Sequence, residues 1–373
     1  MSVSIRLKHS SVAGKAPLPG DLVDGELGLN IEASDPAIYL KDSAGTIRRV
    51  GGSSGVLKAG DTMTGNLTVP SLNSGPLAGF RNQIVNGHML INQRGQSTYT
   101  ITSTTNQYTV DRWFCSLAAG TTQATITNVV LSGSHFPVAV SAGGTGECYI
   151  SQGIPLPYNK QNQFEVGTTW TYSWYSNRST PMYGSLSFET TMAGGGVTIF
   201  AGDSTVTLGN VGASLFRHAI TVTVSQAIGA NSFLKASIAL LPGNNCTGVQ
   251  LEPGPVATPF ELRPEGTELA LCQRYYFKTQ SSNNSALMTG FCSGSNTVTM
   301  VRDLPVTMAK VPVLSYQNLV LQPGALNFTP GLQRHTTSHL SMLATATGVT
   351  LGNGYSIETQ TGVTGFIAAD AEL

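Results

Sequence analysis

The sequence predicts an all-β protein, and three observations along the chain support that class. Short segments of alternating apolar and polar residues recur through most of it, for example VTIFA (197–201) and HAITVTVS (218–225). Glycine, asparagine and proline separate these segments at spacings of about 10 to 15 residues, which is typical of antiparallel strands joined by turns. No long helical period occurs, and no repeat of about 20 to 50 residues indicates a solenoid.

The composition excludes two kinds of partner. The 373 residues include 20 Lys and Arg and 20 Asp and Glu, so the formal net charge is +0. Binding to nucleic acid depends on concentrated positive charge, so no nucleic-acid partner is expected. No apolar run reaches the roughly 18 residues of a membrane helix, and the first residues lack the apolar block of a secretory signal, so membrane insertion is not expected.

Residues 1–52 are expected to form a small amino-terminal β-hairpin module. Two short runs, 27–31 and 38–40, alternate apolar with polar residues, and the turn-rich sequence SDP separates them. A third run follows the SAG turn. Three strands of this length bury too little surface to be stable alone, so the module is expected to depend on partner chains.

The rest of the chain divides into three further segments. Residues 53–77 are Gly/Ser-rich and form the predicted collar. Residues 78–265 carry most of the alternating segments and predict an antiparallel sandwich, with a jelly roll as the expected form. Residues 266–373 resume the strand and turn pattern and predict a smaller carboxyl-terminal β domain.

The stretch ELALCQRYYF (268–277) raises the question of whether Cys272 is a nucleophile. No histidine, which could serve as its base, lies within thirty residues on either side. A short helix here would place Leu269, Cys272 and Tyr276 on one inward face, so we expect a buried thiol. The five cysteines are widely spaced and contain no CxxC pair, which argues against zinc and disulfides and favours reduced thiols.

A cluster of acids offers the alternative of an enzyme, because a glycosidase needs two carboxyl groups flanking a sugar bond. The acids lie among prolines at the junction of two predicted domains, so we interpret them as turn and cap residues that pair with Arg263 or Arg274. The chain is therefore expected not to be an enzyme. The cluster consists of Glu252, Glu261, Glu265 and Glu268.

Two other pairs of residues were candidates for holding metal. His335 and His339 are four residues apart, but no HExxH motif accompanies them, so an exposed pair is expected. Asp21 and Asp203 stand in turns without the regular acidic spacing of a calcium loop. No metal and no cofactor is expected.

The aromatic run TWTYSWYSN (169–177) admits two interpretations. Strand geometry places Trp170, Tyr172 and Trp174 on one side, where alternation favours burial in a sandwich core over stacking on a sugar ring. Tyr175 lies on the other side. Together with aromatic and arginine residues of the flanking turns, it is an expected contact for a glycan. The expected glycan contacts are Tyr149, Tyr158, Tyr175, Arg178 and Tyr183.

Several segments resemble bacteriophage tail fibres. GELGLN (25–30) and IYLKDSAGTIRRV (38–50) are similar to the amino-terminal hairpin module of many such fibres, and GDTMTGNLTV (60–69) is similar to the tail-fibre repeat. The matching residues of the module are Gly25, Glu26, Leu27, Asn30, Tyr39, Lys41, Asp42 and Gly45. Those of the repeat are Gly60, Asp61, Met63, Thr64, Gly65 and Leu67.

The sandwich region resembles a phage and prophage fibre domain of the carbohydrate-binding-module-like kind. FRNQIVNGHMLINQRG (80–95) and YTVDRWF (108–114) are similar to its start, and VQLEPGPVATPFELRPEGTELALCQRYYF (249–277) to its end. DLPVTMAKVPVLS (303–315) and DAEL (370–373) also fit, although Ala309 and Lys310 depart from the commoner pattern. The matching residues at the start are Asn86, Gly87, Asn92, Gln93, Arg94, Gly95, Asp111, Arg112 and Trp113.

The resemblance implies a homotrimeric virion fibre, assembled in the reducing cytoplasm of the host. Its amino-terminal module would join the phage tail or baseplate. Its carboxyl end would bind host surface polysaccharide or lipopolysaccharide without cleaving it. Two alternatives remain open: a structural baseplate or tail adaptor, and a tailspike that cleaves polysaccharide.

Overall fold

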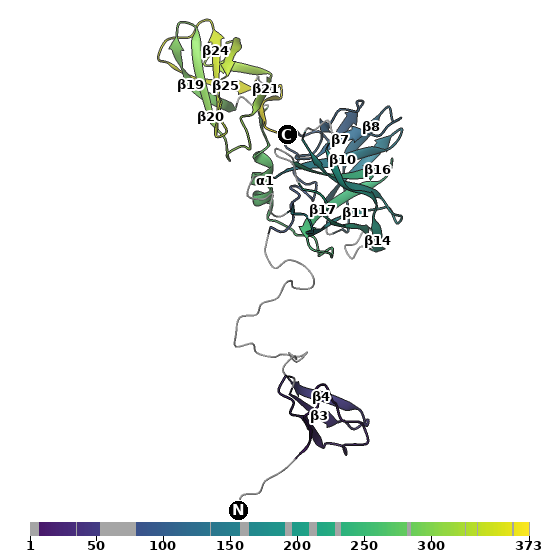
Figure 1. Cartoon of the computed structure of the whole chain (residues 1–373). Helices are drawn as coiled ribbons and strands as arrows, with labels where there is room; N and C mark the ends of the chain where they lie inside the picture. The colour runs from purple at the N-terminus through teal and green to yellow at the C-terminus, as the bar shows by residue number, and fades with distance from the viewer. Residues whose placement is uncertain are drawn as a thin grey trace, which may run out of the picture. The chain divides into compact units, whose positions relative to one another are not determined.

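The computed structural model describes residues 7–34, 36–52, 80–134, 136–156, 164–190, 196–208, 215–227, 233–281, 285–324, 326–333, 335–359 and 362–372. Within these ranges one short helix accompanies several mainly antiparallel sheets, which confirms the predicted all-β class (Figure 1). The chain divides into two compact units, Met1–Val69 and Pro70–Leu373. The predicted collar, with its GDTMTGNLTV segment, lies outside the described residues.

The first unit contains a four-stranded sheet in the order β1-β2-β3-β4, one strand more than the sequence predicted. The loop before β2 covers one face, since Asn30 donates hydrogen bonds from Nδ2 to the carbonyl oxygens of Val12 (2.9 Å) and Lys15 (3.0 Å). The opposite face leaves Leu27 and Ile38 exposed, so it keeps an apolar surface. The strands are β1 (Lys8–Ser10), β2 (Leu27–Asn30), β3 (Ala37–Lys41) and β4 (Ile47–Gly52).

The second unit begins with a two-sheet sandwich. The six-stranded sheet has the order β13-β12-β16-β10-β7-β6 and the seven-stranded sheet the order β14-β15-β11-β17-β9-β8-β5. Consecutive strands such as β10, β11 and β12 alternate between the sheets, as they do in a jelly roll and not in a meander. The strands are β5 (Thr98–Ile101), β6 (Gln107–Tyr108), β7 (Phe114–Leu117), β8 (Ala124–Val130), β9 (Val138–Gly144), β10 (Cys148–Pro155), β11 (Thr169–Ser176), β12 (Tyr183–Glu189), β13 (Val197–Asp203), β14 (Thr205–Leu208), β15 (Phe216–Thr223), β16 (Phe233–Leu240) and β17 (Asn245–Pro253).

The sandwich core lies between these two sheets. Trp170, Tyr172 and Trp174 all point into it and are at most 2% exposed. This confirms the prediction that these three side chains lie in the sandwich core. Tyr172 and Trp174 pack at 5.2 Å between ring centroids, and Trp174 stacks on His218 at 5.5 Å. Residues that are distant in the sequence thus share one core.

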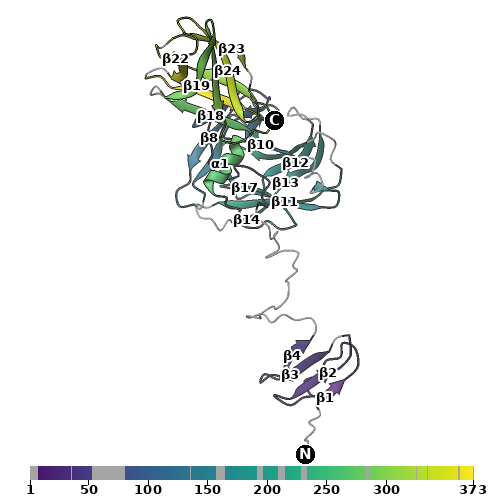
Figure 2. The ribbon, with the colours of Figure 1, turned by 90° about the vertical axis from the view of Figure 1, so that its left-hand side faces the viewer.

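The remaining strands form the part of the second unit that we call the tip, with its own core. It has a three-stranded sheet, β18-β26-β21, and a six-stranded sheet, β22-β25-β19-β20-β24-β23 (Figure 2). The strands are β18 (Tyr276–Ser281), β19 (Ala286–Gly294), β20 (Thr297–Asp303), β21 (Val313–Gln317), β22 (Leu319–Gln322), β23 (Phe328–Gln333), β24 (His339–Ala346), β25 (Gly354–Thr359) and β26 (Gly365–Asp370).

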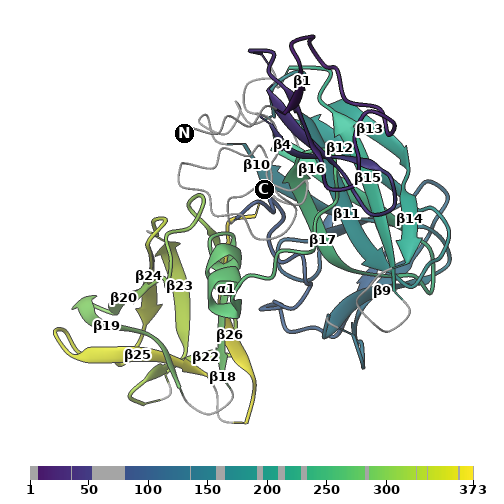
Figure 3. The same cartoon turned by 90° about the horizontal axis from the view of Figure 1, so that it is seen from below.

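Helix α1 (Glu265–Gln273) connects the sandwich to the tip and lies between them (Figure 3). Pro264 precedes the first turn, and its carbonyl oxygen accepts hydrogen bonds from the backbone N–H groups of Thr267 and Glu268. The predicted inward face is correct for Cys272, which is fully buried. It is wrong for Leu269, which is only half-buried. Tyr276 is buried as predicted, but it lies in β18 and not on the helix, because the helix ends three residues earlier.

A buried ion pair joins the sandwich to the tip. Glu372, which follows β26, accepts a hydrogen bond from Nη1 of Arg112, and both side chains are almost fully buried. The Arg112 guanidinium also lies 3.6 Å over the ring of Tyr275 and donates from Nη2 to the carbonyl oxygen of Gly153 (2.5 Å). Arg112 adopts a left-handed backbone conformation (φ 71°), which a non-glycine residue keeps only when its surroundings demand it.

A second arginine extends the same interface. Arg94 lies 3.6 Å from Asp111 and 3.7 Å from Glu372, and its guanidinium is 3.9 Å over the ring of Tyr276. Burial raises the pKa of Asp111 to about 6, while a hydrogen bond from Gln93 and the charge of Arg94 act in the opposite direction. The segments QRG, DRW and DAEL therefore meet at one place, although up to 260 positions separate the residues that touch.

Candidate functional site

Two of the expected glycan contacts lie together on the outer face of the six-stranded sheet. Tyr149 in β10 is opposite Ala239 in β16, and Gly184, which follows Tyr183 in β12, is opposite Ile238, the residue before Ala239. The two tyrosine rings approach edge to face, with centroids 6.3 Å apart and an interplanar angle of 69°. Ala239 lies between the two strands and is only 6% exposed, so the two rings cover it and form one continuous aromatic surface.

Carboxylates flank both tyrosines. Asp203 in β13 is directly opposite Tyr183, and the Glu147 carboxylate lies close to Tyr149. Burial, and after it the Glu147 carboxylate, raise the pKa of Tyr149 to about 12, so its hydroxyl stays protonated at neutral pH. We call these residues the tyrosine strip. They are Glu147, Tyr149, Tyr183, Asp203 and Ala239.

The other expected contacts lie elsewhere. Tyr175 is buried beneath the seven-stranded sheet, where it packs against Phe136 with ring centroids 4.9 Å apart, so it does not join the strip. Arg178 donates from Nε to the hydroxyl of Thr180 (2.7 Å) in the loop before β12. Tyr158 lies outside the described residues.

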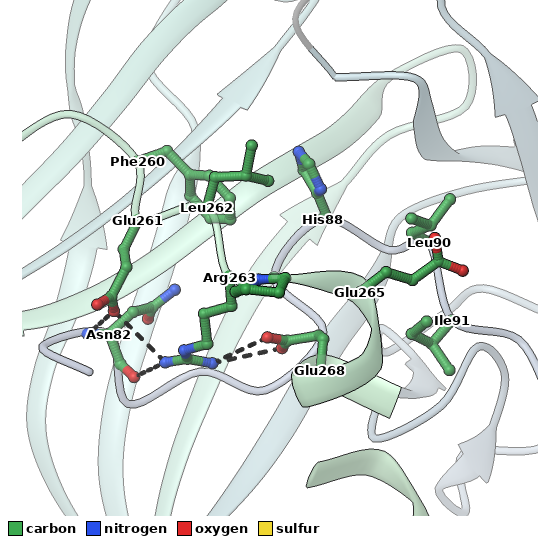
Figure 4. Close-up of a pocket in the computed structure, with 12 residues that line it drawn as sticks. Asn82, His88, Leu90, Ile91, Phe260, Glu261, Leu262, Arg263, Glu265 and Glu268 are labelled. Atoms are coloured by element: carbon green, nitrogen blue, oxygen red, sulfur yellow. Dashed lines mark hydrogen bonds and ion pairs between the residues drawn. The ribbon is translucent and has the colours of Figure 1, made fainter. Parts of the chain in front are cut away.

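A pocket of about 440 Å³ opens beside the start of α1 (Figure 4). His88 and Phe260 form one wall, with ring centroids 5.1 Å apart and planes inclined by 26°. Burial lowers the pKa of His88, so its imidazole is neutral at pH 7. Leu90 and Leu262 add exposed apolar surface to the pocket. The sequence did not predict a pocket at this place.

Most of the other polar residues of this pocket form a network around Arg263, which the exposed Glu265 does not join. The guanidinium of Arg263 binds Glu268 (3.2 Å) and the carbonyl oxygen of Asn82 (Figure 4). It also donates to the carbonyl oxygen of Ile84 (3.0 Å). Glu261 lies 3.6 Å from the same guanidinium and accepts hydrogen bonds from the backbone N–H groups of Phe80 and Asn82. These carboxylates hold segments of the sandwich together.

Three of the four acids that suggested an enzyme pair with arginines, the fourth, Glu265, is exposed in the first turn of α1, and the thiol is buried. Glu252 is fully buried, accepts hydrogen bonds from Gln250 and Thr258, and lies 3.4 Å from Arg81. The sequence predicted Arg263 or Arg274 as the partner of these acids, and Arg263 pairs with Glu261 and Glu268. Burial raises the pKa of Cys272 far above its ordinary value, which disfavours the nucleophilic thiolate.

The imidazole of His339 engages the hydroxyl of Thr336 (3.0 Å) in the turn before β24, and both His335 and His339 are half-buried, so the exposed pair that the sequence predicted is wrong. In the part of the chain that the structure describes, no group of three His, Cys, Asp or Glu residues is placed to hold a metal ion. No helix in that part is long and apolar enough to cross a membrane.

Comparison with known proteins adds no family assignment. No protein-family model matches the chain, and no curated protein matches it. Function must therefore be argued from the residues and their geometry.

Replacing Gly87 with alanine is expected to lower the free energy of unfolding by about 1–3 kcal/mol. A methyl group at Gly87 would lie 2.2 Å from the carbonyl oxygen of Val249, so the paired backbone segments would have to separate. Gly266→Ala is the control, since its methyl group meets nothing within 4 Å and removes a glycine from α1. Thermal unfolding should show a lower Tm for Gly87→Ala only, and equal Tm values would refute the argument.

Proposed function

We propose that the chain is a non-enzymatic bacteriophage tail fibre that attaches the virion to polysaccharide or lipopolysaccharide on the host surface. The observation that carries the proposal is the tyrosine strip. It combines two aromatic rings with two carboxylates on an open sheet face. Sugar rings have apolar C–H faces and many hydroxyl groups, so they match aromatic faces beside hydrogen-bond acceptors.

The proposed assembly is a homotrimer in the virion, joined to the tail or baseplate through the amino-terminal module. The exposed Leu27 and Ile38 of that module support this part of the proposal, because an apolar sheet face is stabilised when a partner covers it. Three copies of a weak sugar site would also bind a repetitive polysaccharide far more tightly than one copy.

Replacing Tyr149 and Tyr183 with alanine is expected to weaken binding to host cells by about tenfold or more. Each aromatic contact contributes about 0.5–1.5 kcal/mol, and 1.4 kcal/mol corresponds to a factor of ten. Labelled protein would be titrated onto host cells and measured by flow cytometry, before and after enzymatic removal of surface polysaccharide.

Tyr316→Ala is the matched control, because Tyr316 and Tyr183 are each 39% exposed but lie on different sheets. Its binding should equal that of the original protein. If the original protein bound no host cells, the structural adaptor would be the better account. If it released reducing sugar from host polysaccharide, and Glu252→Gln abolished that release, the tailspike would replace the proposal.

A further inference from the structure

The outer face of the tip carries a shallow groove of about 720 Å³. It runs across β22, β25 and β19 of the six-stranded sheet. Ser356 in β25 is opposite both Thr289 in β19 and Gln322 in β22, so the three polar side chains form one row on the same face. Glu358 lies two residues after Ser356 in β25, on the same face of the sheet, and accepts a hydrogen bond from the Ser356 hydroxyl (2.7 Å).

An exposed aromatic ring stands beside this row. Phe291 lies two residues after Thr289 on the same face of β19 and is 53% exposed. Its neighbour across the sheet in β25 is Gly354, which has no side chain to cover the ring. A methyl group at Gly354 would meet only a backbone oxygen at 3.9 Å, so the space is open.

The position of the groove within the sheet restricts its ligand. β19 and β25 are interior strands, each hydrogen-bonded on both sides, so a peptide cannot add to them as a further strand. On the edge strand β22, both backbone groups of Leu321 already bond to Leu326, which blocks addition of a peptide strand there. The described lining includes the Glu358 carboxylate and no lysine or arginine, which disfavours nucleic acid, phosphate and acidic sugars. What the groove offers is hydroxyl, amide and carboxylate groups next to one aromatic face.

We propose that this tip groove binds a neutral, hydroxyl-rich sugar residue, whose ring stacks on Phe291 while its hydroxyl groups bond to the row from Thr289 to Gln322. The inference rests on the proposed function and adds to it a second subsite, on a different core from the tyrosine strip. A repetitive polysaccharide carries many copies of the same sugar, so it offers ligand to both subsites.

The test uses the full chain and host cells. Phe291→Ala and Thr289→Val are each expected to lower apparent affinity about fivefold or more, the first by removing the ring and the second by replacing a hydroxyl with a methyl group of the same shape. Val313→Ala, at a 73% exposed position on the other tip sheet, should leave affinity unchanged. Thermal melting would verify that all variants remain folded.

Competition identifies the kind of sugar. Oligosaccharides released from the host envelope by mild acid would be separated by anion exchange into neutral and acidic fractions. The neutral fraction should displace the Tyr149→Ala, Tyr183→Ala variant from cells, and Phe291→Ala added to that variant should abolish its remaining binding to cells.

Two results would overturn the tip groove specifically. In the first, Phe291→Ala and Thr289→Val both bind cells as the original protein does, while the tyrosine-strip variant loses binding. The proposed function would then stand without the tip groove. The other is displacement by the acidic fraction alone. Failure of the original protein to bind cells would instead defeat the proposed function, and the groove proposal with it.

Discussion

Arg112→Met is expected to lower the free energy of unfolding by about 3–5 kcal/mol. The substitution leaves the Glu372 carboxylate buried without its partner. An unpaired buried charge costs far more free energy than the intact ion pair contributes. It also removes the guanidinium from the ring of Tyr275 and the hydrogen bond to Gly153. All three tryptophans of the chain lie in the sandwich core, so urea denaturation followed by tryptophan fluorescence reports the loss.

Two variants separate the buried charge from other effects. Arg112→Met combined with Glu372→Leu removes both charges and should recover most of the lost stability, since a buried ion pair is often replaceable by apolar residues of similar volume. Arg274→Met makes the same change at an exposed position next to Tyr275 and should alter stability by less than about 0.5 kcal/mol. A loss below 1 kcal/mol for Arg112→Met would show that the interface does not depend on this pair.

Trp174→Ala is expected to be similarly destabilising, by about 3–5 kcal/mol. The indole is completely buried, stacks on His218 and contacts the ring of Tyr172, so its removal leaves a cavity between the two sheets. Far-ultraviolet circular dichroism during urea denaturation would measure the loss, because the fluorescence signal itself changes when a tryptophan is removed.

Gly184 provides an internal control for this cavity. A methyl group at Gly184 would lie 3.0 Å from Trp174 and 2.7 Å from Ile220, so Gly184→Ala alone should be destabilising through crowding. In the Trp174→Ala background the same methyl group enters vacated space. The double variant should therefore lose less stability than the sum of the single variants, and strict additivity would mean that the two sites do not share the cavity.

The sequence predicted the features that depend on local periodicity. Alternation along residues 169–177 correctly assigned Trp170, Tyr172 and Trp174 to a core, because a strand places every second side chain on one face. The same logic failed for Leu269, since helical spacing says which residues share a face but not how deeply the helix is covered.

Contacts between distant segments were beyond such reasoning. Neither Asp203 beside Tyr183 nor Glu372 beside Arg112 leaves a local signal, because strand register and chain return are set by packing of the whole unit. Tyr175 was expected at a ligand surface and is buried, because the outer face of its sheet is covered by Phe136 and Leu215. The tip groove likewise becomes visible only once β19, β22 and β25 are neighbours.

The attachment of Glu261 to Phe80 and Asn82 has a mechanical consequence. Tension applied to the chain on the amino-terminal side of Phe80 is carried first by the hydrogen bonds that Glu261 accepts from those two backbone N–H groups. Arg263 holds the same carboxylate at 3.6 Å and the carbonyl oxygen of Asn82, so the load spreads into the segment that leads to α1. Force pulling on the amino-terminal segment would therefore be shared between the two ends of the sandwich sequence before it reached any core strand.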